Sequence, residues 1–401
     1  MRILFASPYI YDTRYKEFSK TSTGFGYMVK DIIEGVSGKH ESFLLTHQIS
    51  RGYCKGYTAV KHQISDILRH LRIRDLCQGL FHMFFTGASF PRRIRYLYYY
   101  IDKGCMIYYI RKIKPDIVHI HGLTYQTKPY IEACEELKAA YVVTLHGLNG
   151  LNDSVRLPDG EKRYELRELE RMSEQNRIVT VVSTGIKRKI FVDYKIPVNN
   201  IRVVLNGTDL RLCYSEKKEN KHMFTLLCIG SLSFNKNQLQ LLRAYCLLER
   251  KEQEAIQIYF AGSDSAHINM EGEIRAAGCA RHVQYCGFVP RERMEDLWEI
   301  ADVNVVVSKE EGFGLSMIEG FTLGIPTLTF GDLDAAEDLY HPDVMELIQE
   351  RTDESVAEGI RSAMSRKWKP DVIREWGKQF SMEAVVSNYE RVYQEILSGK
   401  D

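Results

Sequence analysis

The sequence predicts two doubly wound α/β domains in tandem, each built on a parallel sheet with helices on both faces. Two observations support this fold class. Short β-branched runs recur between helical segments along the chain, and a stretch of turn and charged residues divides them into two series. The chain has 401 residues, of which 44% are apolar and 27% charged, so it is long enough for two separate cores.

The first series begins at the N-terminus. Residues 1–6 form an apolar run that is too short for a signal peptide and is followed by a Ser-Pro-Tyr loop, so we place it in the sheet. Further β-branched runs, typical of buried parallel strands, lie at 116–121, 140–146 and 177–183. These runs define the first predicted sheet.

The second series follows a linker candidate. A strand at 201–205 ends in the turn cluster 206–209, and the charged stretch 215–221 comes next. The following β-branched runs are at 224–230, 256–262, 282–287 and 303–307. We therefore expect one domain over residues 1–209 and a second over 210–379. Open α/β sheets bind ligands at the carboxyl ends of their strands, which predicts a cleft between the domains.

The composition excludes several classes of protein. A formal net charge of +1 argues against a general nucleic-acid binder, which needs a basic face. The cysteines are odd in number and contain no Cys-x-x-Cys pair, so we expect reduced thiols in a cytoplasmic protein and no metal site. They lie at positions 54, 77, 105, 134, 213, 228, 246, 279 and 286. No stretch approaches the roughly 18 apolar residues that span a bilayer.

Two glutamates stand eight positions apart in the stretch SKEEGFGLSMIEGFTLGIP, at Glu311 and Glu319. The run at 303–307 indicates a buried strand before them, and 315–323 indicates a helix. Free amides at the start of that helix, around Gly314, favour a phosphate group, and carboxylates accept hydrogen bonds from hydroxyls. The pattern suits a sugar nucleotide, although taken alone it also fits a solvated helix start.

One segment, residues 61–114, interrupts the alternation. It contains eleven Lys/Arg against three acidic residues, with ten aromatic residues interleaved. Ile64, Ile67, Leu68 and Leu71 lie on one face of a predicted helix beside basic residues, which suits an interfacial helix near anionic lipid. The alternative is a basic, aromatic helical pair that covers the first sheet. Nucleic-acid binding is a weaker third interpretation of the segment, because it contains no recognisable nucleic-acid-binding motif.

Together with Gly230, Lys236, Gly324 and Pro326, the Glu311 stretch makes the chain resemble the retaining glycosyltransferases of family 4, in glycosyl transferases group 1, which have the two-domain GT-B fold. The resemblance covers nearly the full length. It is strongest in VVLNGTDL, LLCIGSLSFNKN and SKEEGFGLSMIEGFTLGIP, and looser in DIVHIHG and VVTLHG.

The resemblance implies a donor site. Glu319 would accept the ribose hydroxyls of a nucleotide, Glu311 would hold hydroxyls of the transferred sugar, and Lys236 would neutralise the diphosphate. The implied donor-binding residues are Gly24, Gly26, Gly230, Ser231, Lys236, Phe288, Val289, Glu311, Gly312, Phe313, Gly314, Leu315 and Glu319. Because a fixed ammonium and helix amides would stabilise the leaving group, we expect no metal and no other cofactor.

The first domain would contribute His146, at the end of VVTLH, which resembles the family's histidine beside the sugar. With Glu311 and Lys236 it makes up the implied catalytic set. Gly24-Phe25-Gly26 matches the glycine loop that approaches the diphosphate, ahead of a helix predicted at 27–34.

Two other features of the first domain follow. His119 and His121 alternate with apolar residues and so face one side of a strand; we interpret them as structural or supporting. Residues 380–401 are similar to the family's closing helix, which crosses back onto the first domain.

The chain departs from the family pattern at two places. Gly230 is followed by Ser231, where the family has an arginine that clamps the diphosphate with the lysine. Arg291 or Arg293 is the candidate replacement. The N-terminal loop reads Gly-Phe-Gly instead of adjacent glycines.

The resulting hypothesis is retaining, metal-independent transfer of a hexosyl residue from a UDP- or GDP-sugar to a saccharide or lipid-linked acceptor in bacterial surface polysaccharide synthesis. We expect a cytoplasmic protein, with a peripheral place on the inner face of the plasma membrane through segment 61–114. The alternatives are a catalytically weak or inactive sugar-nucleotide-binding protein and a GT-B epimerase or phosphorylase. A nicotinamide dehydrogenase is disfavoured, because no Gly-x-Gly-x-x-Gly directly follows the first strand.

Overall fold

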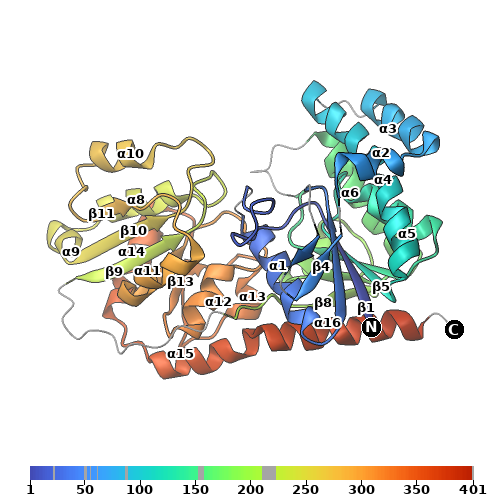
Figure 1. Cartoon of the computed structure of the whole chain (residues 1–401). Helices are drawn as coiled ribbons and strands as arrows, with labels where there is room; N and C mark the ends of the chain where they lie inside the picture. Colours follow the sequence, from blue (N-terminus) through green and yellow to red (C-terminus); the bar gives the residue numbers. More distant parts are fainter. Residues whose placement is uncertain are drawn as a thin grey trace. The chain divides into compact units, whose positions relative to one another are not determined.

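The computed structural model describes the whole chain except residues 21–22, 49–51, 55, 61, 86–88, 152–157, 210–222 and 400–401. The linker candidate at 215–221 lies outside the described residues. The chain divides into two compact units, a first unit of Met1–Asn206 with Met382–Asp401 and a second unit of Gly207–Ser381. Figure 1 shows that each unit is a sheet covered by helices, which confirms the predicted α/β fold class.

The sheet of the first unit has eight strands in the order β3-β4-β2-β1-β5-β6-β7-β8. Adjacent strands are parallel except for β3 and β4, which pair antiparallel at one edge. The strands are β1 (Arg2–Ser7), β2 (Glu41–Thr46), β3 (Tyr53–Cys54), β4 (Tyr57–Ala59), β5 (Ile117–His121), β6 (Tyr141–Leu145), β7 (Val179–Val181) and β8 (Ile201–Val203). The side chains of β5 and β6 are buried on both faces, as expected for central parallel strands.

The helices of the first unit are α1 (Gly24–Ser37), α2 (Ile64–Arg69), α3 (Ile73–Phe85), α4 (Phe90–Ile113), α5 (Lys128–Glu136), α6 (Asp159–Glu174), α7 (Thr184–Val192) and α16 (Met382–Ser398). Helix α16 packs closely on α1, because a Cβ built on Gly35 would lie 2.8 Å from Met382 Cγ. The end of the chain therefore contributes to the core of the first unit.

The glycine segment before α1 differs from the expected loop. Gly24-Phe25-Gly26 forms the first turn of the helix, which starts three residues earlier than predicted. The reason is Thr23, whose side-chain oxygen caps the helix by accepting from the Gly26 amide at 3.1 Å. Gly26 is also required sterically, since a Cβ there would lie 2.9 Å from the Tyr11 backbone nitrogen.

The sheet of the second unit has six strands, all parallel, in the order β11-β10-β9-β12-β13-β14. They are β9 (Phe224–Ile229), β10 (Ile256–Ala261), β11 (Val283–Tyr285), β12 (Val303–Val306), β13 (Thr327–Phe330) and β14 (Met345–Ile348). In this order β9 and β12 are neighbours although they are far apart in sequence. The loops that follow these two strands therefore emerge side by side.

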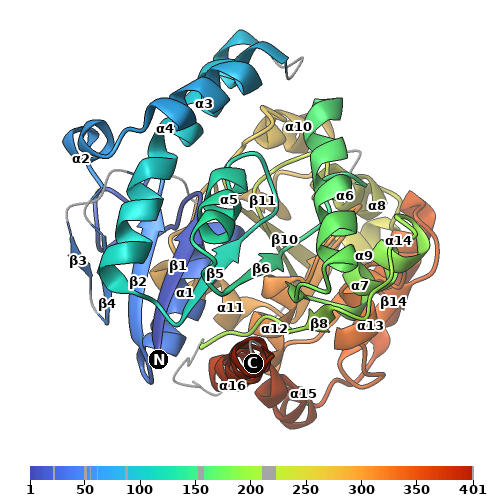
Figure 2. The ribbon, with the colours of Figure 1, turned by 90° about the vertical axis from the view of Figure 1, so that its right-hand side faces the viewer.

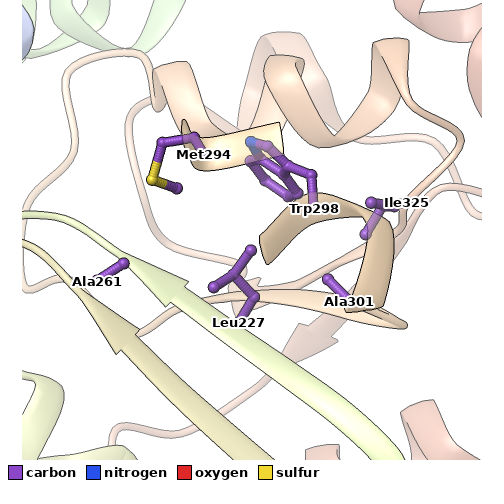
Figure 3. Close-up of a cluster of buried hydrophobic side chains, with 6 residues drawn as sticks. All are labelled: Leu227, Ala261, Met294, Trp298, Ala301 and Ile325. Carbon is purple, nitrogen blue, oxygen red and sulfur yellow. The ribbon is translucent and has the colours of Figure 1, made fainter. Parts of the chain in front are cut away.

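The helices of the second unit are α8 (Gln238–Cys246), α9 (Arg250–Glu254), α10 (Met270–Ala276), η1 (Arg291–Arg293), α11 (Met294–Ile300), α12 (Leu315–Thr322), α13 (Ala336–Leu339), α14 (Asp353–Ser365), α15 (Pro370–Gly377) and η2 (Lys378–Phe380). A core cluster joins α11 to the sheet. It consists of Leu227, Ala261, Met294, Trp298, Ala301 and Ile325, with the indole of Trp298 above the strands (Figure 3). In the described part of the chain, no helix is both long and apolar enough to cross a membrane.

Candidate functional site

The first group of predicted site residues lies in the loop after β9. Gly230 follows the strand with φ 144°, a conformation that L side chains rarely adopt, and the methylenes of Lys236 lie over it. A Cβ on Gly230 would be 3.4 Å from Lys236 Cε. The loop is held in shape by Ser233, whose hydroxyl oxygen accepts from the Lys236 amide at 3.1 Å. The ammonium is thereby carried over the end of β9.

The second group lies between β12 and α12. Gly314 takes a left-handed conformation, with φ 82°, and α12 begins at the next residue. Glu311, in the turn before it, forms an ion pair with Lys236 and accepts from the Ser308 hydroxyl at 3.2 Å. The Glu311 side chain is 15% exposed and that of Lys236 is 31% exposed. The structure therefore joins the predicted sugar carboxylate and the predicted phosphate cation directly.

Asn235 ties these two loops together, a role that the sequence did not reveal. Its side-chain amide donates to the Glu310 carbonyl at 3.0 Å, and its Oδ1 accepts from the Glu310 amide at 3.1 Å. Its backbone carbonyl accepts from the Lys309 amide at 2.7 Å. Such a three-point contact fixes the neighbours Lys236 and Glu311 relative to each other. The sequence around Asn235 contains no motif that indicates this role. The role becomes visible only when β9 and β12 are known to be neighbours in the sheet.

Glu319 lies further along α12, with its side chain 19% exposed. Arg291, in the turn η1, approaches it with 3.5 Å between Nη2 and Oε1, and the same nitrogen is 3.4 Å from the Thr208 hydroxyl. Of the two arginines considered as substitutes for the missing cation, Arg291 therefore lies beside a predicted donor residue, whereas Arg293 is exposed. Ser231 itself makes a neutral contact, 3.3 Å from the Ser263 hydroxyl.

The remaining donor-binding candidates of the second unit divide by exposure. Phe313 is 3% exposed, and its ring packs edge-on to Phe380 at a centroid distance of 6.1 Å, so only its backbone is a candidate contact. Val289 packs against the Trp298 cluster, while Phe288 is 45% exposed. Gly312 and Leu315 flank the turn that starts α12.

In the first unit, the structure brings His146 together with the glycine segment. His146 follows β6, and the ring of Phe25 meets its imidazole edge-on at 5.1 Å between centroids. Its Nε2 lies 3.0 Å from Nδ1 of His121, and the two rings are stacked at 5.3 Å. The segment 24–26 and His146 therefore form one local group, with His121 as the supporting residue that the sequence predicted.

Burial controls the protonation of this group. It lowers the pKa of His146 to about 3 and holds the pKa of His121 well below its usual range. His121 Nε2 and His146 Nδ1 are buried with no hydrogen-bond partner among the described residues. The imidazole of His146 is therefore neutral at physiological pH and cannot serve as a phosphate-binding cation.

His119 extends the group into the core of the unit. Its ring stacks on that of His121 at 4.2 Å, which confirms that both residues face the same side of β5. Its Nδ1 lies 2.7 Å from the Tyr393 hydroxyl of α16, and its Nε2 lies 2.6 Å from the Thr144 hydroxyl. Burial lowers the pKa of His119 to about 3. The residue is fully paired and is structural, in agreement with the sequence interpretation.

A further polar cluster in the first unit was not predicted. Buried Asp102 accepts from His62 Nε2 at 2.6 Å and from His47 Nδ1 at 2.9 Å, and these contacts hold the pKa of the carboxyl at about 2 despite the burial, which acts to raise it. Ligand atoms of His62, Asp102 and Cys105 lie within 4.8 Å of one another, a geometry that could hold a metal ion. The direct hydrogen bonds already occupy these oxygens. His62 and Asp102 are 40 positions apart in the sequence, so no short metal-binding motif marks this cluster.

Comparison with known proteins agrees with this geometry. The family model described as glycosyl transferases group 1 matches residues 214–380, and the model described as glycosyltransferase family 4 matches residues 79–212. The fold and these matches define a GT-B glycosyltransferase. The chain belongs to the group 1 glycosyltransferases, as its sequence predicted.

Individual relatives are distant. An uncharacterized glycosyltransferase of Methanocaldococcus jannaschii is 23% identical over 268 residues, which cover 63% of this chain and 67% of that protein. Among solved structures, sucrose-phosphate synthase from Thermosynechococcus elongatus aligns over 100% of both chains with a TM-score of 0.74 and 15% identity. HepE from Anabaena, solved with UDP and glucose, aligns over 98% of this chain and 99% of that chain with a TM-score of 0.63 and 15% identity. At these identities the structural likeness shows the fold alone.

Proposed function

We propose that the chain transfers a hexosyl residue from a UDP- or GDP-sugar to a saccharide or lipid-linked acceptor, with retention of anomeric configuration, in the synthesis of bacterial surface polysaccharide. The observation that carries the proposal is the Lys236–Glu311 pair, held by Asn235 where the loops after β9 and β12 meet. A cation and a carboxylate at the carboxyl ends of adjacent parallel strands suit a diphosphate joined to a sugar.

Each charged group has a distinct role in this proposal. Glu319 accepts the hydroxyls of the ribose, and Glu311 accepts hydroxyls of the transferred hexose. Lys236 and the amides at the start of α12 stabilise the negative charge that develops on the leaving diphosphate. Arg291 supplies the second cation that Ser231 does not provide, since it lies beside Glu319. The solved complex of HepE with UDP and glucose supports a nucleotide-sugar donor.

The proposed chemistry requires no metal and no enzyme nucleophile. The glycosidic bond to the diphosphate breaks while the acceptor oxygen attacks from the same face, and the departing phosphate oxygen takes the acceptor proton. His146, whose imidazole is neutral, is the candidate of the first unit for a place beside the sugar. The fixed ammonium of Lys236 then replaces the charge stabilisation that a divalent ion would provide.

A donor panel tests the proposal. The purified chain is incubated with UDP- and GDP-sugars and candidate acceptors, with and without a chelator, while the released nucleoside diphosphate and the product anomer are measured. We expect one donor to be consumed, the chelator to have no effect, and Glu319→Ala to reduce donor affinity. If no donor is bound or consumed, or if Glu319→Ala changes nothing, the proposal is wrong.

The same panel separates the competing functions. Donor binding without turnover, across all acceptors, would identify a sugar-nucleotide-binding protein, the alternative suggested by Ser231 in place of arginine. Inversion of configuration at a carbon of the donor sugar, without transfer to an acceptor, would identify an epimerase. A product of inverted anomeric configuration would rule out the retaining mechanism but would still support glycosyl transfer.

A further inference from the structure

Helix α3 of the first unit turns its apolar side chains toward solvent. Ile73 is 81% exposed, Leu80 36%, Phe81 58% and Phe84 65%, and Cys77 is exposed between them. Their spacing of i, i+4, i+7, i+8 and i+11 places them on one face of the helix. A helix that merely covers a sheet has the opposite arrangement, with its apolar face inward.

The inward face of α3 carries a buried ionic network. Asp75 is completely buried, pairs with Arg72 at 2.9 Å and lies 4.0 Å from the ammonium of Lys103. Lys103, itself 1% exposed, donates to Glu132 of α5 at 2.8 Å and to Gln78 at 3.3 Å. The helix is therefore anchored by charges on its protein side. This finding argues against the simpler interpretation of the segment as an ordinary covering helix.

The neighbouring helices extend the exposed apolar face. Ile64 and Leu68 of α2 are 65% and 64% exposed, and Phe90 and Ile94 of α4 are 72% and 47% exposed. Ile67, expected on the same face, is buried instead. In Figures 1 and 2, α2, α3 and the start of α4 lie at the end of the first unit opposite α16. We call these eight side chains, Ile64, Leu68, Ile73, Leu80, Phe81, Phe84, Phe90 and Ile94, the apolar face.

The exposed charges of these three helices have one sign, although Arg74 lies 3.7 Å from the Glu136 carboxylate of α5. The three acidic residues of α2, α3 and α4 are all buried: Asp66, Asp75 and Asp102. The exposed charged residues of these helices are all basic: Arg69, with a side chain 70% exposed, Arg74, 64% exposed, Arg95 and, at the C-terminal end of α4, Arg111 and Lys112. An exposed apolar face bordered by arginines matches the boundary between acyl chains and anionic headgroups.

We propose that the apolar face docks on an anionic bilayer surface, with α3 lying in the plane of the interface. The arginines then meet lipid headgroups while Phe81 and Phe84 enter the acyl boundary. A second copy of the chain fits less well, because a twofold interface would place the arginines of one copy against those of the other. Tyr96, Tyr99 and Tyr100 are buried and belong to the interior of the unit, so the docking residues are phenylalanines and aliphatic residues instead of tyrosines.

Vesicle flotation of the full chain tests this proposal. We expect the protein to float with phosphatidylcholine vesicles that contain about one third phosphatidylglycerol, and to remain unbound with pure phosphatidylcholine. Phe81→Ser with Phe84→Ser should weaken binding at least about tenfold. Arg74→Glu should weaken it about fivefold or more and reduce its salt dependence.

Matched controls separate docking from general effects. Phe191→Ser, on α7, removes a phenylalanine that is 59% exposed, almost the same as Phe81, and should float like the wild type. Lys195→Glu, also exposed on the first unit, is the control for the charge change. Circular dichroism melting should be the same for the phenylalanine and Lys195 variants, because their substituted side chains are exposed. Arg74→Glu also removes the ion pair with Glu136, so its flotation is compared at a temperature below its own melting transition.

Three results would overturn the proposal. They are equal flotation on anionic and neutral vesicles, equal loss of flotation in the Phe191→Ser control, and a concentration-dependent dimer in analytical ultracentrifugation that the Phe81 and Phe84 substitutions dissolve. The last result would assign the apolar face to a second copy of the chain. None of these measurements depends on sugar transfer, so the docking and the proposed activity can fail separately.

Discussion

Replacement of Lys236 by methionine separates its catalytic role from its structural role. The substitution keeps the length of the side chain over Gly230 and removes the ammonium that pairs with Glu311. If the ammonium stabilises the leaving diphosphate, its loss should lower kcat about 10²- to 10³-fold, equivalent to about 2.7–4 kcal/mol of transition-state stabilisation. The free energy of unfolding should change by only about 1 kcal/mol, because an ion pair with side chains 31% and 15% exposed contributes little to stability.

The assay measures release of nucleoside diphosphate from the donor identified by the panel, at saturating acceptor. Urea unfolding of the same preparations gives the stability of each variant. Lys236→Arg is the matched control, because it retains the positive charge, and it should keep more activity than Lys236→Met. Glu311→Gln breaks the same ion pair but retains the ammonium, so its unfolding in urea shows how much the pair itself contributes to stability.

A kcat for Lys236→Met within about threefold of the wild type would refute a role of the ammonium in the transition state, because a group that acts there should cause a far larger loss. This role is also refuted if Lys236→Met and Glu311→Gln lose activity only in proportion to their loss of stability. Either result would make the Lys236–Glu311 pair a structural contact between two loops.

Three further predictions concern the cores and the second cation. Burial lowers the pKa of His119 from 6.5 to about 3, so the contribution of this residue to stability is present above pH 6.5 and is lost as the pH falls. Between pH 7 and pH 5, the wild type should therefore lose about 2 kcal/mol more free energy of unfolding than His119→Gln, as measured by urea denaturation. Gly262→Ala, whose Cβ would lie 2.1 Å from the Gly230 carbonyl, should destabilise the second unit by roughly 3 kcal/mol in the same assay. Gly278→Ala, at φ +68° with open space around it, should cost only about 1–2 kcal/mol, and equal effects would contradict the steric argument. Arg291→Ala should weaken UDP or GDP binding about tenfold in calorimetry, whereas Arg293→Ala should leave it unchanged.

The strand and helix pattern around the donor-site residues could be predicted because it is local. The β-branched run before Ser308 and the glycine before Leu315 determine a strand, a turn and a helix within one short stretch of sequence. The strands β2, β3, β4 and β14 were not predicted. Strands β3 and β4 are too short to show a period, and β2 takes its place from pairing with β1 and β4, which is a tertiary effect.

The missed interactions are long-range ones. Asn235 acts across 75 positions of sequence, and the cluster of His47, His62 and Asp102 spans more than 50. The inverted polarity of α3 was hidden for a different reason. Its periodicity predicts an amphipathic helix but does not say which face is outward, and only the buried pairing of Asp75 with Arg72 and Lys103 reveals the orientation.

The contact between Tyr393 and His119 has a consequence for how the protein is made. The strand that carries His119 leaves the ribosome early, but the helix that supplies its hydroxyl partner is translated only after the entire second unit. During synthesis the surface of the first unit along α1 and β5 therefore lacks α16 until translation ends. The second unit is a continuous stretch of chain and can fold before then. The native packing of the first unit is therefore completed last, after the residues of the second unit have all been translated.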